Sequence, residues 1–240
     1  MTFRLALPLA LAAALAALAG CSTPPDWFHT LRPSGAAAAT PPAAHAGGRT
    51  LAVGPVTVPD SLARDAWVIR VGETGVQVHE HQLWTQGLQG EIAQALVDQL
   101  NRAPLPEALW ADAGPTGSGA GTDLDVPASL RVRVQVLRFD SLLAPEPAIA
   151  DQFRWTIECL PADNALAPID AARYRVVRSG VREVSQAAPP ADPAVESGQQ
   201  RYDRLARAHA DALRSTAADI DAALRASAAD RARDCADAPR

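Results

Sequence analysis

Alternating apolar and polar residues predict a series of strands along the middle of the chain. The alternation is clearest over residues 130–139, where Val132, Val134 and Val136 are separated by arginine and glutamine. Such a period of two is typical of a strand with one buried face and one wet face. Further strands are predicted at residues 51–58, 66–71, 75–80, 152–159 and 174–184. The turn residues 72–74 predict that the strands on either side form a hairpin.

A helical period replaces the alternation in two places. Residues 83–101 carry an apolar stripe, with polar residues such as Asp98 on the opposite side, and a longer stripe runs through residues 202–224, with Arg204 among its outward charges. Residues 109–127, which contain four glycines, are predicted to be a flexible loop, and residues 186–197 another loop. The pattern predicts a single α+β domain over 49–228. Its sheet is mixed or antiparallel, with about five to six strands and two main helices packed on it.

The first residues have the pattern of a bacterial signal peptide. An apolar run follows Arg4 and is too short to span a bilayer, which requires about 20 residues. The run ends in Leu18-Ala19-Gly20-Cys21, which resembles the lipobox of bacterial lipoproteins. That resemblance implies recognition of Leu18, Ala19 and Gly20 by signal peptidase II, removal of residues 1–20, and attachment of lipid to Cys21. The alternative is an ordinary secreted protein whose cleavage site adjoins a cysteine.

The segments that flank the domain are predicted to be unstructured. Residues 21–48 are rich in proline and alanine and have no periodic apolar pattern, which predicts a disordered tether behind the anchor. Residues 229–240 are predicted to be a flexible tail. In lipoproteins of Gram-negative bacteria, Asp after the lipidated cysteine retains the protein in the inner membrane. Ser22 stands there in this chain, so the expected location is the periplasmic face of the outer membrane.

Composition excludes several classes of function. The formal net charge is −5, whereas nucleic-acid-binding domains carry a basic excess. The chain contains no lysine, so a Walker-type phosphate loop and Schiff-base catalysis are both excluded. His79 and His81 are two residues apart, but solvent-facing histidines are the commoner interpretation, and neither a metal nor another cofactor is expected. Cys159 and Cys235 could form a disulfide in an oxidising compartment, or Cys159 could be a buried thiol.

Several segments together resemble a known family. They are the 53–60 segment Val-Gly-Pro-Val-Thr-Val-Pro-Asp, the hairpin, the helix start around Trp84, the 132–139 strand, and the terminal helix around His209. In order and spacing they resemble the PqiC-type lipoproteins, also called ABC-type transport auxiliary lipoproteins. The resemblance extends from residue 49 to about residue 225. It implies an outer-membrane lipoprotein of an MCE transport system, which moves lipid between the two membranes.

The leading hypothesis is therefore a non-enzymatic accessory subunit of an MCE lipid-transport system. The expected partners are an MCE-domain protein, the membrane through the lipid anchor, and further copies of the chain, with no nucleic acid. One alternative is an envelope-assembly lipoprotein that binds other cell-envelope machinery. Another is a hydrolase, for which Ser118 in the glycine-rich loop is a poor nucleophile.

The expected partner-binding residues lie on the first long strand and at the predicted helix start. The backbone around Gly54, Pro55, Val56 and Pro59 could offer sheet-edge groups for pairing. Trp84 is the accompanying aromatic candidate, because tryptophan is enriched at binding hot spots. The competing interpretation places Trp84 in the core.

Overall fold

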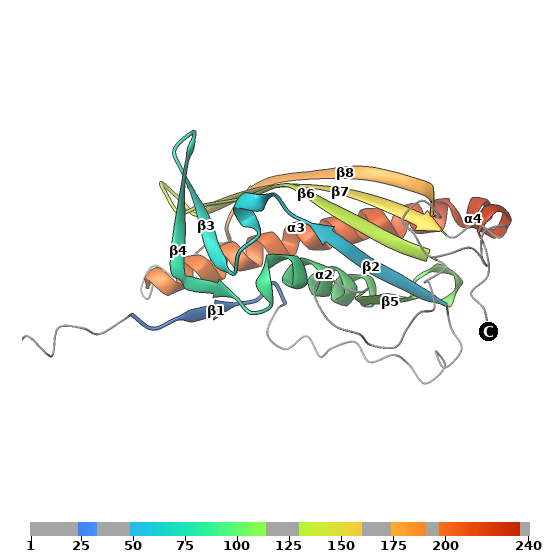
Figure 1. Ribbon diagram of the computed structural model, residues 1–240, viewed down its shortest axis with the longest axis horizontal. Helices are drawn as coiled ribbons and strands as arrows, with labels where there is room; N and C mark the ends of the chain where they lie inside the picture. The colour runs from blue at the N-terminus through green and yellow to red at the C-terminus, as the bar shows by residue number, and fades with distance from the viewer. Residues whose placement is uncertain (1–23, 33–48, 114–129, 160–173, 191–196, 236–240) are drawn as a thin grey trace, which may run out of the picture.

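The chain forms two β-sheets, with helices packed against the larger sheet (Figure 1). The structure, a computed structural model, describes residues 24–32, 49–113, 130–159, 174–190 and 197–235. The strands are β1 (Trp27–His29), β2 (Thr50–Thr57), β3 (Ala66–Val71), β4 (Gly75–Trp84), β5 (Trp110–Ala113), β6 (Leu130–Leu142), β7 (Ala148–Cys159) and β8 (Arg175–Ala187). The helices are α2 (Gly87–Leu100), α3 (Gly198–Ala226) and α4 (Ala228–Asp234), with short 3-10 turns η2 (Asp60–Leu62) and η3 (Pro106–Ala108).

The larger sheet is mixed and has the order β5-β2-β6-β7-β8. Strand β2 runs parallel to both of its neighbours, whereas β6, β7 and β8 are antiparallel. The predicted alternation is confirmed, because Val132, Val134 and Val136 are buried while Arg133 is exposed. Strand β6 extends past the predicted end to Leu142, beyond a bulge. The α+β prediction with a mixed sheet is confirmed.

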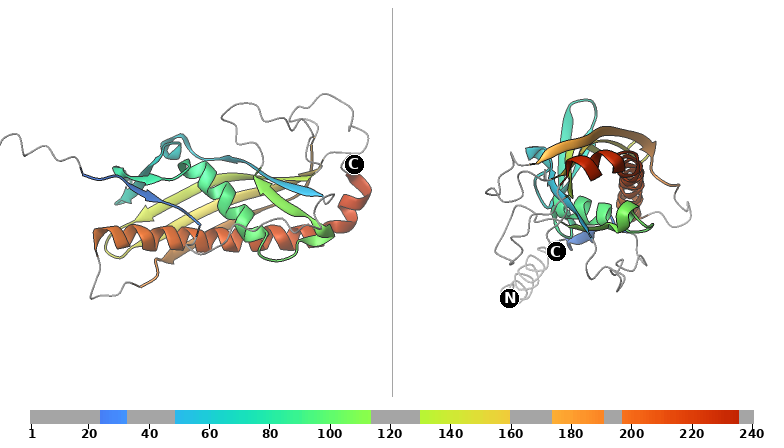
Figure 2. Two further views of the ribbon diagram at one scale, coloured as in Figure 1. Left: turned by 90° about the horizontal axis from the view of Figure 1, so that it is seen from below. Right: turned by 90° about the vertical axis from the view of Figure 1, so that its right-hand side faces the viewer.

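Helices α2 and α3 lie together on one side of this sheet. Seen end-on, the sheet curves around both helices (Figure 2). Helix α3 packs on β7 and β8, and α2 packs on β2 and against α3. The predicted apolar stripes point into this core, where Ile92 and Leu96 of α2 and Leu205, Leu213 and Ile220 of α3 are fully buried. Burial of these stripes between sheet and helices is the main contribution to stability.

Helix α2 begins later than predicted. Leu83 and Trp84, which the helical period included, belong to the end of β4. Gly87 has a φ of 67°, a backbone conformation that favours glycine, and it separates the strand from the helix. The outward position predicted for Asp98 is also wrong. Its carboxylate is buried and accepts a hydrogen bond from Arg32 at 2.6 Å, so a partner from a distant segment covers it.

The long terminal helix is confirmed as α3. Ser197 and Gln200 form a reciprocal capping box at its start, which satisfies backbone donors that a helix leaves free. Arg204, predicted to face outward, is instead buried and donates to the carbonyl of Pro189. The segment that follows β8 therefore meets this side chain at Pro189, a contact that the helical period alone could not indicate.

The predicted hairpin is confirmed as β3 and β4 and belongs to a second sheet of order β1-β4-β3. The third strand, β1, is parallel to β4 and comes from the N-terminal segment. Its residues Trp27, Phe28 and His29 align with residues 82–84. The carbonyl of His29 also accepts a hydrogen bond from the backbone of Thr85.

The prediction that the whole of 21–48 is a disordered tether is therefore wrong for residues 24–32. Leu31 is almost fully buried, and its backbone N–H donates to the carboxylate of Glu91 at 2.9 Å. Thr30 donates to the same carboxylate at 2.8 Å. The proline and alanine content of the segment concealed a short run, Trp27 to Leu31, that has apolar residues to bury and polar residues to pair.

The predicted loop over 109–127 also contains a strand. Residues 110–113 form β5, which pairs in parallel with the first half of β2. Asn101 supports the pairing, because its side chain exchanges two hydrogen bonds with the backbone of Ala111. Residues 114–129, including Ser118 and the glycine run around it, lie outside the described residues.

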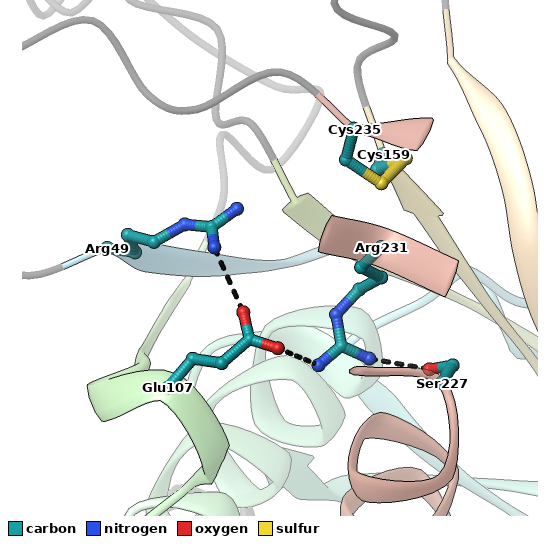
Figure 3. The surroundings of a disulfide bond; sticks show 6 residues. All are labelled: Arg49, Glu107, Cys159, Ser227, Arg231 and Cys235. Carbon is teal, nitrogen blue, oxygen red and sulfur yellow. Dashed lines mark hydrogen bonds and ion pairs between the residues drawn. A yellow bond between two sulfur atoms is a disulfide. The ribbon is translucent and has the colours of Figure 1, made fainter. Parts of the chain in front are cut away.

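The C-terminal residues join the folded domain through a disulfide. Cys159 at the end of β7 is bonded to Cys235, with their Cα atoms 5.6 Å apart (Figure 3). Helix α4 leads to Cys235, and its Arg231 is buried against Glu107 and Ser227. Glu107 also accepts from Arg49 at 2.9 Å. Residues 229–235 thus belong to the domain and not to a flexible tail, because a covalent bond and a buried arginine hold them.

Candidate functional site

The residues predicted to direct lipid attachment precede the described structure. Leu18, Ala19, Gly20 and Cys21 all lie outside the described residues. The structure begins at residue 24, only a short distance along the chain from Cys21. A lipid on Cys21 would therefore be followed almost directly by folded protein. No described helix is long and apolar enough to cross a membrane.

The predicted contact segment around Gly54–Pro59 lies where one side of β2 loses its neighbour. The ladder between β2 and β5 ends at Val53, whereas β2 continues along β6 through Val56 and Thr57. Pro55 and Thr57 are exposed and Pro59 is partly exposed, while Gly54 and Val56 are buried. Of the predicted contact residues, Pro55 and Pro59 are thus accessible. Thr57 is an accessible neighbour on the same open edge.

Trp84 is a core residue, so the prediction that it forms a surface contact is wrong. Its side chain is 4% exposed and lies against Trp67, with ring centroids 4.1 Å apart. Phe139 meets it edge-on. Trp84 ends β4 on the side that faces the core, so its large apolar surface is used in joining the small sheet to the large one.

Three side chains in the core form a hydrogen-bonded chain in the order serine, histidine, aspartate. Ser141 Oγ lies 2.8 Å from His209 Nε2, and His209 Nδ1 lies 2.8 Å from Asp151 Oδ2. The serine comes from β6, the aspartate from β7 and the histidine from α3. Trp67 Nε1 donates to Ser141 Oγ at 2.9 Å. Phe139 stacks on the imidazole at 3.8 Å.

The indole of Trp67 at one end and the carboxylate of Asp151 at the other fix the direction of the hydrogen bonds in this network. Trp67 can only donate, so the hydroxyl of Ser141 accepts from it and is free to donate to His209 Nε2. With Nε2 of His209 accepting from Ser141, Nδ1 carries a proton and donates to Asp151. Burial raises the pKa of the Asp151 carboxyl, and the nearby His209 partly opposes that rise. Such a fully connected buried network stabilises one arrangement of sheet and helix.

The order of groups is that of a catalytic triad, but the surroundings are those of a core. Ser141, His209 and Asp151 are all nearly or fully buried, and the indole of Trp67 occupies one side of the serine oxygen. A substrate could reach Ser141 only if the core opened. The arrangement therefore ties α3 to β6 and β7.

The sequence carries a signal for this network. Ser141 and Asp151 are polar residues at inward positions of β6 and β7, just beyond the predicted ends of those strands at 139 and 152.

His79 and His81, although close in sequence, have different partners. His79 Nδ1 bonds to the hydroxyl of Tyr202, and His81 Nδ1 lies 2.8 Å from Asp26. Burial lowers the pKa of His79. Among the residues the structure describes, no cluster of three or more His, Cys, Asp or Glu side chains is placed to hold a metal ion.

His29 fixes β1 to the rest of the protein. Its ring is buried, meets Trp67 edge-on at 4.9 Å, and bonds through Nε2 to Gln82 at 2.7 Å. Burial lowers the pKa of His29, and the hydrogen bond with Gln82 and the charge of Asp203 offset only part of that effect. A neutral imidazole therefore suits this position.

A groove of about 470 Å³ lies between the N-terminal segment and α3. Its lining includes Phe28, Leu31, Arg32, Asp203, Ala206 and Ala210. Of the apolar members, Phe28 is exposed, whereas Leu31, Ala206 and Ala210 are buried. The charged members are of both signs, so the groove has no strong preference for an anion or a cation.

Comparison with known proteins identifies a family and a shared fold. The family described as ABC-type transport auxiliary lipoprotein component matches residues 29–221. Among curated proteins, none shows significant similarity to the chain.

Solved structures share the architecture at low sequence identity. A crystal structure of an uncharacterized protein is 17% identical, with a TM-score of 0.53, and the match covers 82% of this chain and 97% of the other. A crystal structure of a protein from Xanthomonas campestris is 16% identical, with a TM-score of 0.51, and the match covers 76% and 87% of the two chains. At such identities the similarity concerns the fold alone.

Proposed function

Because this chain belongs to the family of ABC-type transport auxiliary lipoprotein components, we propose that it is the outer-membrane lipoprotein of an MCE-type lipid-transport system. In this role it acts without enzymatic activity of its own. It holds an MCE-domain protein at the periplasmic face of the outer membrane and so supports the integrity of the envelope. The observation that carries the proposal is the family match, which covers most of the folded domain.

The N-terminal sequence supports the membrane half of this proposal. Leu18-Ala19-Gly20-Cys21 supplies a lipid-attachment signal, and Ser22 in place of Asp favours the outer membrane. One acyl chain binds a bilayer only marginally, so the two or three chains of a mature lipoprotein are needed for a stable anchor. Anchoring raises the effective concentration of the domain near a membrane-bound partner.

The open edge of β2 supports the proposed binding of an MCE-domain protein. Beyond Val53 this strand has β6 on one side and no strand of the described structure on the other. An extended segment of an MCE-domain protein could pair there, since unpaired strand edges are sites of β-augmentation. Pro55, Thr57 and Pro59 are the accessible residues of this edge.

Burial of the serine–histidine–aspartate network supports a binding function over hydrolysis. A nucleophile must lie within reach of a substrate carbonyl and of groups that stabilise its oxyanion. Ser141 Oγ is enclosed by Trp67 and His209.

Lipid attachment is tested with labelled fatty acid. We expect the parent chain to take up label and to fractionate with the outer membrane. Cys21→Ser should take up none and leave a precursor that signal peptidase II does not process. Equal labelling of parent and variant would contradict the assignment of Cys21.

Partner binding is tested by capture from detergent-solubilised membranes. The parent lipoprotein should retain an MCE-domain protein. Thr57→Asp should weaken retention about tenfold, a typical loss of about 1.4 kcal/mol for one contact residue. Thr50→Asp is the matched control, because Thr50 is also exposed, at the other end of β2, but its strand is paired with β5 on that edge. Retention of unrelated envelope machinery with no MCE-domain protein would instead favour the envelope-assembly alternative.

A further inference from the structure

The two residues that begin β1 are large, aromatic and exposed. Trp27 is 48% exposed and Phe28 is 65% exposed. Successive residues of a strand point to opposite faces, so both faces of β1 are uncovered at this point. Adjacent exposed aromatic side chains are unusual on a soluble surface and commonly mark an interaction site.

These aromatic residues are held in fixed positions on the domain. The backbone of β1 is paired with β4, and the next residues, His29 and Leu31, are buried. Asp26, immediately before Trp27, lies 2.8 Å from His81. Trp27 and Phe28 therefore move with the folded domain and do not belong to a flexible leader.

The chain length between Cys21 and Trp27 limits how far this surface can lie from an anchored lipid. Extended backbone covers 3.3–3.6 Å per residue, so the link over residues 22–26 reaches about 20 Å at most. A headgroup region several ångströms thick borders each side of the hydrocarbon core. With Cys21 acylated, Trp27 and Phe28 are the exposed aromatic residues nearest to the lipid along the chain.

We propose that Trp27 and Phe28 insert into the headgroup region of the leaflet that holds the lipid on Cys21, and so orient the domain on the membrane surface. The inference rests on the lipid attachment proposed above. Tryptophan favours the interface because its ring is apolar and its N–H can still bond to water or headgroups. Phe28 adds apolar area on the opposite face of the strand.

The charges near this surface indicate that the contact depends on apolar burial. Arg32 is paired with Asp98, and Asp203 and Arg207 bring opposite charges to the groove beside Phe28. With no excess of positive charge there, the contact should not require anionic lipid and should change little with salt.

Tryptophan fluorescence provides a direct test. The mature lipidated protein is reconstituted into vesicles of phosphatidylethanolamine and phosphatidylglycerol, with either ordinary or brominated acyl chains. The chain has five tryptophans. Three of them, Trp67, Trp84 and Trp155, are buried in the core, so bromine reaches them poorly. We expect the brominated lipid to quench part of the parent's emission and Trp27→Phe to abolish that quenching.

Two further variants complete the test. Trp110→Phe is the matched control. Trp110 is partly exposed but lies on β5, in the other sheet from β1, so its replacement should leave the quenching intact. Phe28→Trp should increase the quenched fraction. Absence of quenching in a parent that floats with the vesicles would overturn the inference while leaving lipid attachment in place. Persistence of quenching in Trp27→Phe would overturn it equally. Failure of the parent to float at all would contradict the anchor, and with it the inference.

Discussion

At the scale of residues, Ser141 and Asp151 are exceptions to the pattern that otherwise defines the core. Inward positions of β6 and β7 are mostly apolar, yet these two polar side chains occupy such positions and meet His209 from α3. A buried polar group costs stability unless it is hydrogen-bonded. Trp67 and His209 supply the partners that Ser141 needs.

Ser141→Ala should destabilise the protein without acting as an active-site mutation. The indole N–H of Trp67 and Nε2 of His209 would both lose their partner in the core, at a cost of about 2–3 kcal/mol in the free energy of unfolding. Ser215→Ala is the matched control, because Ser215 is exposed and should cost less than about 0.5 kcal/mol. Denaturant unfolding measures both variants. Complete loss of partner capture by a folded Ser141→Ala protein would contradict a purely structural role.

Gly180 is a second position where one residue determines local packing. A Cβ at this position would lie 2.3 Å from Cζ2 of Trp155, a ring that is itself buried. Gly180→Ala should therefore lower the free energy of unfolding by about 1–3 kcal/mol through overpacking between β7 and β8. Gly198→Ala at the start of α3 has open space and should be neutral or slightly stabilising. Equal thermal shifts for the two variants would refute this reason.

At the scale of elements, periodic patterns predicted the long strands and helices but did not predict the short strands. The strand β6 and helix α3 each offer many repeats of one period, so their positions follow from sequence. β1 and β5 are short and lack a repeat, and only pairing with distant strands defines them. Most of the predicted contact segment lies on β2, as the alternation predicted, whereas the burial of Trp84 could not be read from the sequence because it depends on Trp67 from another strand.

The short element β1 should be sensitive to pH through His29. Burial lowers the pKa of His29 below 6.5, so the folded state binds fewer protons than the unfolded state below that pH. The stability contributed by the neutral ring is present above pH 6.5 and is lost as the pH falls through the folded-state pKa. His79 contributes in the same direction. Asp151, whose pKa is raised, contributes with the opposite sign and loses its contribution as pH rises.

His29→Gln separates this contribution from the others. The variant should show a smaller decrease in melting temperature than the parent between about pH 7.5 and about pH 5.5, because it lacks the titrating ring. Both proteins retain His79 and Asp151, so the difference between their pH profiles reports His29. Superimposable profiles would show that protonation of His29 does not control the docking of β1.

At the scale of the whole molecule, the first and last segments that the structure describes, residues 24–32 and the residues up to Cys235, are both fastened to the domain. Residues 24–32 pair with β4 and α2, and Cys235 is bonded to Cys159. The composition of residues 21–48 and 229–240 predicted unstructured segments. Composition is an average over a segment, so it does not reveal a single disulfide or a short run of buried residues. The sequence left the pairing of the two cysteines open, since their separation of 76 residues says nothing about their distance in space.

Loss of the disulfide should have a large effect on stability. Closing a loop with a sequence separation of 76 residues restricts the unfolded chain and is worth about 4 kcal/mol. Cys235→Ser and the reduced parent should therefore unfold at similarly lower denaturant concentrations. Addition of reductant to Cys235→Ser is the control and should leave its midpoint unchanged, because the bond between Cys159 and Cys235 is already absent. An unchanged midpoint for Cys235→Ser would show that this bond contributes little.

If Cys21 carries lipid as proposed, the pairing of β1 with β4 determines which residues set the distance between the membrane and the folded domain. Residues 33–48 join two parts of one folded unit, so lengthening or shortening them leaves the distance between lipid and domain unchanged. Residues 22–26 alone govern that distance. With such an anchor, a partner would have to approach to within a few nanometres of the leaflet, and insertions before Asp26 should extend the range over which the domain can engage it.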